Sequence, residues 1–158
     1  MKHRFAAPVA SAAAILLLGA CSDDGPTTLA QGEDVELVGE EGLAGQTLDI
    51  SAEEADGEVT GELRFVDPGG QVVVRVECAD TDTDGVVILG GTVTKSTDGQ
   101  ISGLVALFIR EGEPDRVAVW IDEGENGSCD DLLKNRRDVL DDDSEFVDVE
   151  AGEDIKTD

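Results

Sequence analysis

After the first third of the chain, apolar and polar residues alternate in short runs that are separated by turn residues. In 58–66, Val59, Leu63 and Phe65 fall on one face of an extended chain and Arg64 falls on the other. Period-two alternation of this kind is typical of a β-strand with one buried face. Similar runs predict five further strands, at 47–52, 71–78, 86–94, 100–110 and 116–121.

Two of these runs carry further predictions. In 71–78, the residues at every second position are expected to share the buried face: Val72, Val74, Val76 and Cys78. The run 86–94 begins with an unbroken apolar stretch, which indicates burial on both faces. Its Gly90-Gly91 pair indicates a bulge or a sharp bend in the strand.

The connections between the runs are short, which suits antiparallel neighbours and leaves no room for crossover helices. The pattern therefore predicts an all-β domain, a small antiparallel β-sandwich or barrel of about 6–8 strands. Residues 130–141 are predicted to form a short helix capped by Ser128 or Asp130, with a charged loop as the alternative. A closing strand is expected at 146–149, and another short run near Ile155.

The N-terminus has the layout of a secretory signal peptide over residues 1–20, with a basic start, an apolar run and small residues at its end. The apolar run is shorter than the ~20 residues that a membrane-spanning helix needs, and no second run of that length follows. Leu18-Gly19-Ala20-Cys21 resembles the bacterial lipoprotein box, in which lipid is attached to the cysteine and the signal is cut before it. The resemblance implies an exported protein whose Cys21 carries acyl chains such as palmitate. The alternative is an ordinary signal peptide with an unrelated cysteine near the cut.

Removal of the signal leaves 158 − 20 = 138 residues, the size of one domain. Residues 21–45 are rich in Gly, Asp and Glu, and such a segment buries too little apolar surface to offset its ordering entropy. We therefore expect a flexible acidic tether at 21–45 and the β-domain at 46–158. Within the tether, 34–38 is a candidate edge strand.

The charge of the chain excludes several classes of function. The formal net charge is −26, and loss of Lys2 and Arg4 with the signal changes it to 9 − 37 = −28. Nucleic-acid binding requires clustered Lys and Arg and is excluded, and binding to bare anionic lipid is disfavoured. The only histidine, His3, lies in the signal, so the mature chain has no His-based triad, Cys-His pair or metal site.

One acidic turn matches half of a calcium loop. Asp80, Asp82 and Asp84 stand at positions 1, 3 and 5, followed by Gly85 at position 6, but position 12 is Gly91 instead of an acid. Because Asp-Gly is also common in hairpin turns, a plain turn is the competing interpretation. Ca²⁺ is the one cofactor that the sequence suggests.

A second acidic loop, at 121–131, contains Asp122 and Glu125. If the fold brings this loop beside the turn at 80–84, both sets of carboxylates are candidate ligands of one ion. A solvated loop on a very acidic protein is the competing interpretation.

Cys78 and Cys129 remain as an even pair once Cys21 is lipidated. In an oxidising compartment we expect them to form a disulfide, which closes a loop of 129 − 78 = 51 residues and fixes the second acidic loop to the sheet. The alternative is two free thiols.

Three stretches taken in order resemble a set of small exported bacterial lipoprotein β-domains without an assigned activity: GEVTGELRFVDPGGQVVVRVEC, GVVILGGTVT and VAVWIDEGENGSCDD. In that set a Gly-x-x-x-Gly strand, a strand ending in cysteine, a hydrophobic-Gly-Gly strand and an Asp-x-Gly-Glu loop follow one another. The resemblance covers about residues 46–131. It implies an exported β-domain and carries over no catalytic residue.

These observations predict a lipid-anchored extracytoplasmic protein whose β-domain is a binding or envelope-structural module and not an enzyme. The membrane is one expected partner, and an envelope protein or a polysaccharide is the other candidate. One alternative is a weakly calcium-dependent surface adhesin or assembly factor, which the two acidic loops favour. Another is a secreted hydrolase that uses two carboxylates, which requires a cleft holding an acid of raised pKa.

Overall fold

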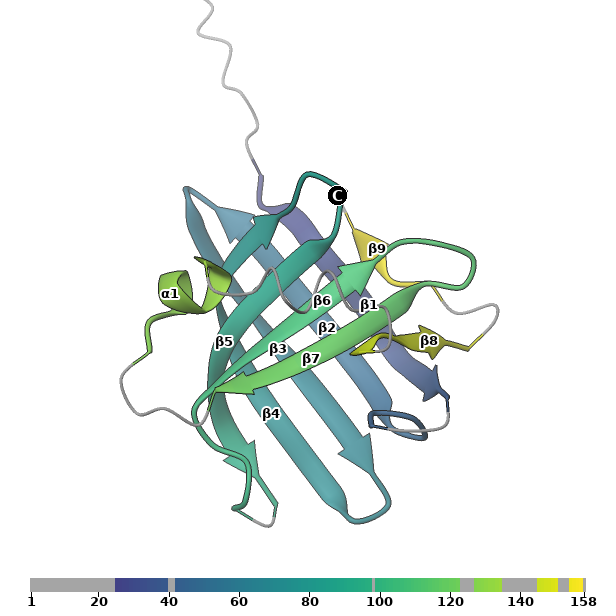
Figure 1. The fold of residues 1–158 in the computed structure, drawn as a ribbon. Helices are drawn as coiled ribbons and strands as arrows, with labels where there is room; N and C mark the ends of the chain where they lie inside the picture. The colour runs from purple at the N-terminus through teal and green to yellow at the C-terminus, as the bar shows by residue number, and fades with distance from the viewer. Residues whose placement is uncertain are drawn as a thin grey trace, which may run out of the picture.

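The computed structural model describes residues 25–39, 42–97, 99–122, 127–134, 145–150 and 154–157. This part of the chain contains nine antiparallel strands in one sheet and one short helix (Figure 1), which confirms the predicted all-β class. The elements are β1 (Thr27–Val38), β2 (Thr47–Ala55), β3 (Glu58–Asp67), β4 (Gly70–Thr81), β5 (Val87–Ser96), β6 (Leu104–Arg110), β7 (Arg116–Asp122), α1 (Cys129–Lys134), β8 (Val147–Val149) and β9 (Lys156–Thr157).

The sheet closes on itself as an up-and-down barrel. Each strand from β1 to β8 pairs antiparallel with the next, and β8 in turn pairs with β1. β9 also pairs with β1, at Ala30 and Gln31, whereas β8 pairs with it at Leu37 and Val38. β8 and β9 thus occupy the position of a single interrupted strand beside β1. This explains why nine strands appear instead of six to eight.

The connections alternate between the two ends of the barrel because successive strands reverse direction. One end, which we call the entry end, holds the start of β1 and the connections β2–β3, β4–β5 and β6–β7. The other, which we call the far end, holds the connections β1–β2, β3–β4 and β5–β6 and the last residue of β7. In Figure 1 the start of β1 and the β2–β3 and β4–β5 connections lie at the top, and the β6–β7 connection lies at the right.

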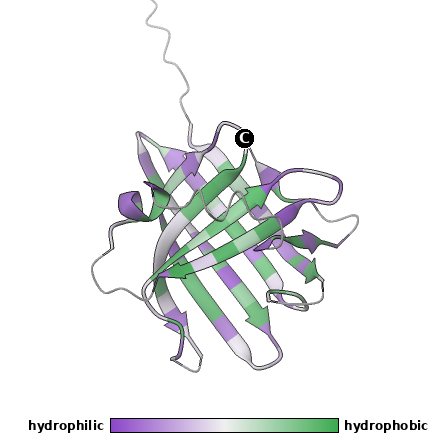
Figure 2. Ribbon diagram, in the orientation of Figure 1, coloured by the Kyte–Doolittle hydropathy of each residue, from purple (hydrophilic) through white to green (hydrophobic). Residues whose placement is uncertain are grey.

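Alternate side chains of the strands fill the barrel interior. Leu37, Leu48, Leu63, Val74 and Leu107 are fully buried there. An eight-stranded barrel is just wide enough for side chains to fill, so this interior is a packed core. Figure 2 shows the hydrophobic residues along the strands and many of the hydrophilic ones at the turns.

A second apolar cluster lies on the outer face of β5, β6 and β7. Ile88, Ala106 and Phe108 belong to it, and Leu132 of α1 and Phe146 cover it from outside. The first half of β5 and nearly all of β6 are therefore buried on both faces, as the unbroken apolar run at 86–94 predicts.

The start of the domain differs from the prediction. The tether expected through residue 45 is wrong for 27–38, because these residues form β1 and bury Ala30, Val35 and Leu37 in the interior. The candidate edge strand at 34–38 is part of β1 and pairs on both sides. Register shifts between Thr28 and Ala30 and between Gly32 and Val35 break the alternation that identifies the other strands.

The C-terminal elements agree with the prediction where they are described. α1 begins after Ser128, whose Oγ accepts a hydrogen bond from the backbone N–H of Asp131 at 3.1 Å, so Ser128 is the N-cap. Residues 135–141 of the predicted helix lie outside the described residues. β8 confirms the closing strand. Over the described residues, no helix has the length and apolar character needed to span a membrane.

Candidate functional site

A bulge in β4 decides on which side of the sheet the disulfide lies. Val76 pairs with Gly91 and Cys78 pairs with Gly90, so Glu77 is an extra residue between two paired positions. One extra residue reverses the alternation between the two faces. Val76 points into the interior cluster, and Cys78 points outward. The expectation that Cys78 shares a buried face with the three preceding valines is therefore wrong.

On the outer face, Cys78 forms a disulfide with Cys129, the first residue of α1, with a Cα–Cα distance of 5.9 Å. This confirms the predicted pair. A Cβ atom at Gly90 would come within 2.7 Å of the Sγ of Cys78 and 3.0 Å of the Sγ of Cys129. A Cβ at Gly91 would lie 1.9 Å from the carbonyl oxygen of Arg75. The first glycine of the pair thus makes room for the disulfide, and the second permits the bulge.

The acidic turn between β4 and β5 is organised by Asp82. Its Oδ1 accepts hydrogen bonds from the backbone N–H groups of Asp84 at 2.9 Å and Val86 at 2.8 Å. The carboxylate of Asp80 accepts a hydrogen bond from the N–H of Thr81 at 2.8 Å. Aspartates that bond to their own turn in this way are common in hairpins. Two of the three calcium ligands predicted here therefore also stabilise the turn.

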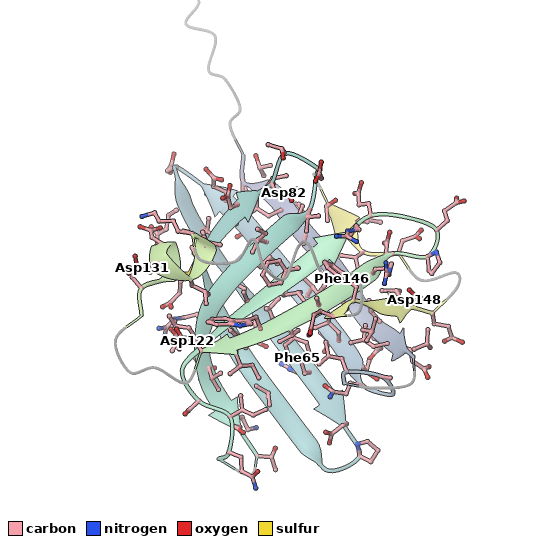
Figure 3. The ribbon with its side chains drawn as sticks, viewed as in Figure 1. Phe65, Asp82, Asp122, Asp131, Phe146 and Asp148 are labelled. Atoms are coloured by element: carbon pink, nitrogen blue, oxygen red, sulfur yellow. A yellow bond between two sulfur atoms is a disulfide. The ribbon has the colours of Figure 1, made fainter. Side chains whose placement is uncertain are left out.

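The second acidic loop comes after β7, whose last residue lies at the opposite end of the barrel from the acidic turn. Asp122 pairs with Leu104 at the far end of β6 and β7, whereas Asp82 lies at the entry end (Figure 3). Glu125 lies outside the described residues. Among the residues that are described, no group of three or more His, Cys, Asp or Glu side chains is placed to hold a metal ion. Calcium binding stays a prediction that rests on the sequence.

The buried residue Asp115 holds the β6–β7 connection against the C-terminal segments that contain β8 and β9. Asp115 is only 7% exposed, and its Oδ1 and Oδ2 accept hydrogen bonds from the N–H groups of Gly112 at 2.9 Å and Ile155 at 3.0 Å. Its backbone oxygen accepts a third from the N–H of Val149 at 2.8 Å. One residue thereby ties the β6–β7 connection to both C-terminal strands. All three hydrogen bonds hold parts of the backbone together, so the role of Asp115 is structural.

Phe146 lies on the outer face of the sheet, beside arginines of β6 and β7. The guanidinium carbon of Arg110 lies 4.2 Å from the centre of its ring, and that of Arg116 lies 5.7 Å away. These two arginines pair directly across β6 and β7, an arrangement of like charges that is unfavourable by itself. The electron-rich ring offsets this repulsion, as does the Asp148 carboxylate, which lies 3.2 Å from the Nε of Arg116.

A shallow pocket of about 440 Å³ beside the disulfide is bordered by four carboxylates. They belong to Glu54, Glu58, Glu77 and Asp130. The hydroxyl of Thr92 donates to Glu77 at 2.6 Å, and this bond, followed by one from Arg75, lowers the pKa of Glu77 below its ordinary value. The pKa of Asp131 is also lowered, mainly by the Ser128 hydroxyl. General acid catalysis needs the opposite shift, so these carboxyls do not support the hydrolase alternative.

Inward-facing apolar side chains are partly exposed at both ends of the barrel. At the entry end, Val59 and Ala79 are partly exposed. At the far end, Val72 and Val93 are partly exposed, and Ile121 is 39% exposed.

At the far end lies a pocket of about 200 Å³, which we call the far mouth. Its lining includes Gln46, Phe65, Asp67, Gln71, Thr97 and Ile101. Asp67 is the one charged residue among the described residues that line it, and its Oδ1 accepts hydrogen bonds from the N–H groups of Gly69 and Gly70, both at 2.7 Å. On a chain in which 30% of residues are charged, this surface of amides, a hydroxyl and apolar groups is distinct.

Sequence reasoning did not identify the far mouth. The alternation identifies Phe65 and Val72 as buried, but the rim comes from separate connections that meet only when the barrel closes. No local motif contains Gln46, Gln71 and Thr97 together. The closure of the sheet was the missing information.

Comparisons with family models, with curated proteins and with solved structures give no match for this chain.

Proposed function

We propose that this protein is a lipid-anchored extracytoplasmic protein whose β-barrel is a binding or envelope-structural module. The observation that carries the proposal is Leu18-Gly19-Ala20-Cys21 at the end of a signal-like segment, with the first strand beginning at Thr27. Acyl chains contribute ~0.8 kcal/mol for each buried methylene, so two or more chains on Cys21 suffice for stable attachment.

The disulfide supports an extracytoplasmic location. Cys78 and Cys129 are bonded across the outer face, and disulfides persist in oxidising compartments and are rare in reducing ones. The surplus of carboxylates is consistent with a protein that has to remain soluble at the outside of a cell.

The far mouth is the surface that suits binding best. Gln46 and Gln71 supply side-chain amide groups beside apolar walls, a combination that fits an uncharged partner such as a polysaccharide or a neutral segment of an envelope protein. The hydroxyl of Thr97 is bonded to the backbone N–H and carbonyl groups of Gln71 and shapes the rim. The carboxylate of Asp67 is engaged by the backbone of its own turn and contributes little to recognition.

The proposal is tested by replacing the lipidated cysteine in a bacterial host that processes lipoproteins. We expect Cys21→Ser to abolish incorporation of labelled palmitate and to leave the protein unprocessed or soluble. The matched control is Cys78→Ser with Cys129→Ser, which retains Cys21 and keeps the label. A Cys21→Ser protein that still matures and sediments with membranes would show that the lipoprotein proposal is wrong.

A further inference from the structure

The position of β1 shortens the link between the proposed anchor and the folded domain. Cys21 and Thr27 are separated by 27 − 21 = 6 residue steps. A fully extended chain spans at most ~3.3–3.6 Å per residue, so this link reaches about 20 Å. The tether predicted from composition, with 25 residues at 21–45, would reach about 80–90 Å.

The link joins the barrel at one end of its axis. Thr27 pairs with Glu54, next to the Asp56-Gly57 turn between β2 and β3, so it lies at the entry end. The far mouth lies at the opposite end of the same strands. Glu58 and Val66, near the two ends of β3, are eight residues apart, which corresponds to about 26 Å along a strand.

From this placement we infer that the entry end faces the bilayer and that the far mouth points away from it. The inference rests on the proposed lipid anchor and adds the orientation of the domain. A link that reaches at most about 20 Å holds the entry end near the lipid headgroups. The far mouth is then presented to partners in the surrounding space.

Charge acts in the same direction on an anionic membrane. The entry end carries exposed carboxylates on all three of its connections or the strand ends beside them, among them Asp56, Asp84 and Glu111. With a net charge of −28 spread over the mature chain, the barrel is repelled by anionic headgroups instead of lying along them. The repulsion acts within a Debye length, ~8 Å at physiological salt, and a barrel lying on its side brings more carboxylates into that range than an upright one, so the upright orientation is favoured.

The orientation is measured with vesicles and a matched pair of tryptophans on β3. The mature protein, with its disulfide intact, is coupled through the Cys21 thiol to a maleimide lipid in vesicles that contain a dansyl-headgroup lipid. In a Trp120→Phe background, Glu58→Trp and Val66→Trp place the donor near the entry end and the far end of one strand. Both positions are exposed in the folded domain.

We expect energy transfer from position 58 to exceed that from position 66 roughly twofold or more, because about 26 Å along a strand that tilts by ~35–45° corresponds to about 20 Å along the barrel axis. Equal transfer, or more transfer from position 66, would overturn the inference. A 20-residue Gly/Ser insertion between Asp24 and Gly25 is expected to remove most of the difference. A difference that persists unchanged would show that the short link does not orient the barrel.

This experiment separates the two proposals because the anchor is attached chemically. A chain that carries no lipid on Cys21 in cells contradicts the proposed function but leaves the vesicle result unaffected. A lipidated chain with the reverse pattern of energy transfer contradicts the orientation alone.

Discussion

At the scale of single residues, Asp115 is the clearest case of a polar group that the fold depends on. It is the one charged side chain that is buried among the described residues, and both of its oxygens accept backbone hydrogen bonds. A buried donor that loses its acceptor costs more than the bond itself contributes, because it has no water to replace the acceptor. The penalty is largest for the N–H group of Ile155, because that donor is buried.

We therefore expect Asp115→Ala to lower the free energy of unfolding by about 1–3 kcal/mol or more, the cost of an unsatisfied buried donor. Asp115→Asn keeps one oxygen acceptor and should lose less. Asp67→Ala is the matched control, because Asp67 also accepts two backbone bonds but is exposed. Urea unfolding of the three variants measures the differences. An Asp115→Ala loss no larger than that of Asp67→Ala would contradict the structural role.

At the scale of elements, the disulfide and the helix act together. α1 has six residues, too few to be stable alone, and it is held to the outer face by Cys129 and by the burial of Leu132. The bridge closes a loop of 51 residues. In the chain-entropy model this contributes ~4 kcal/mol through the unfolded state.

We expect Cys78→Ala with Cys129→Ala to lower the free energy of unfolding by up to ~4 kcal/mol and to release α1 from the sheet. Gly90→Ala is expected to destabilise the native protein, since its Cβ would lie 2.7 Å from the Sγ of Cys78. The same change should cost less in the double-alanine background, where both Sγ atoms are absent. Gly25→Ala, which meets no atom within 4 Å, is the control. Equal costs of Gly90→Ala in both backgrounds would refute the role assigned to Gly90.

The strands from β2 to β7 were predictable from sequence because their runs either alternate, as in β2 and β3, or are continuously apolar, as in β5 and β6, with turn residues between them. β1 was not, since two bulges interrupt its pattern and Asp34 adopts a positive φ of 52° within it. The sequence also identified the cysteine pair and an irregularity beside Gly90-Gly91, but the bulged residue is Glu77 of the neighbouring β4 and not a residue of β5. The outward direction of Cys78 was not predicted. That direction depends on which strand contains the extra residue, and only the register shows this.

At the scale of the whole molecule, the surplus of negative charge is the dominant feature. The formal net charge of −26 makes the carboxylates repel one another, so screening by salt should stabilise the fold in a manner that does not depend on which cation is added. This general effect has to be separated from specific calcium binding at the acidic turn.

The calcium alternative is decided by comparing Ca²⁺ with Mg²⁺ at equal millimolar concentration and ionic strength. The turn lacks an acid at position 91, and Asp82 is already bonded to two backbone N–H groups, so any site should be weak, with a Kd of ~10⁻⁴–10⁻³ M. At a calcium concentration equal to its Kd, one site adds only ~0.4 kcal/mol, or about 2 °C in Tm. We therefore expect Ca²⁺ and Mg²⁺ to give nearly the same Tm, and Asp82→Ala to lower it in both because the turn loses its hydrogen bonds. A rise of more than about 10 °C that is specific to calcium and lost in Asp82→Ala would instead make calcium binding the leading function, because it exceeds what a weak site can supply.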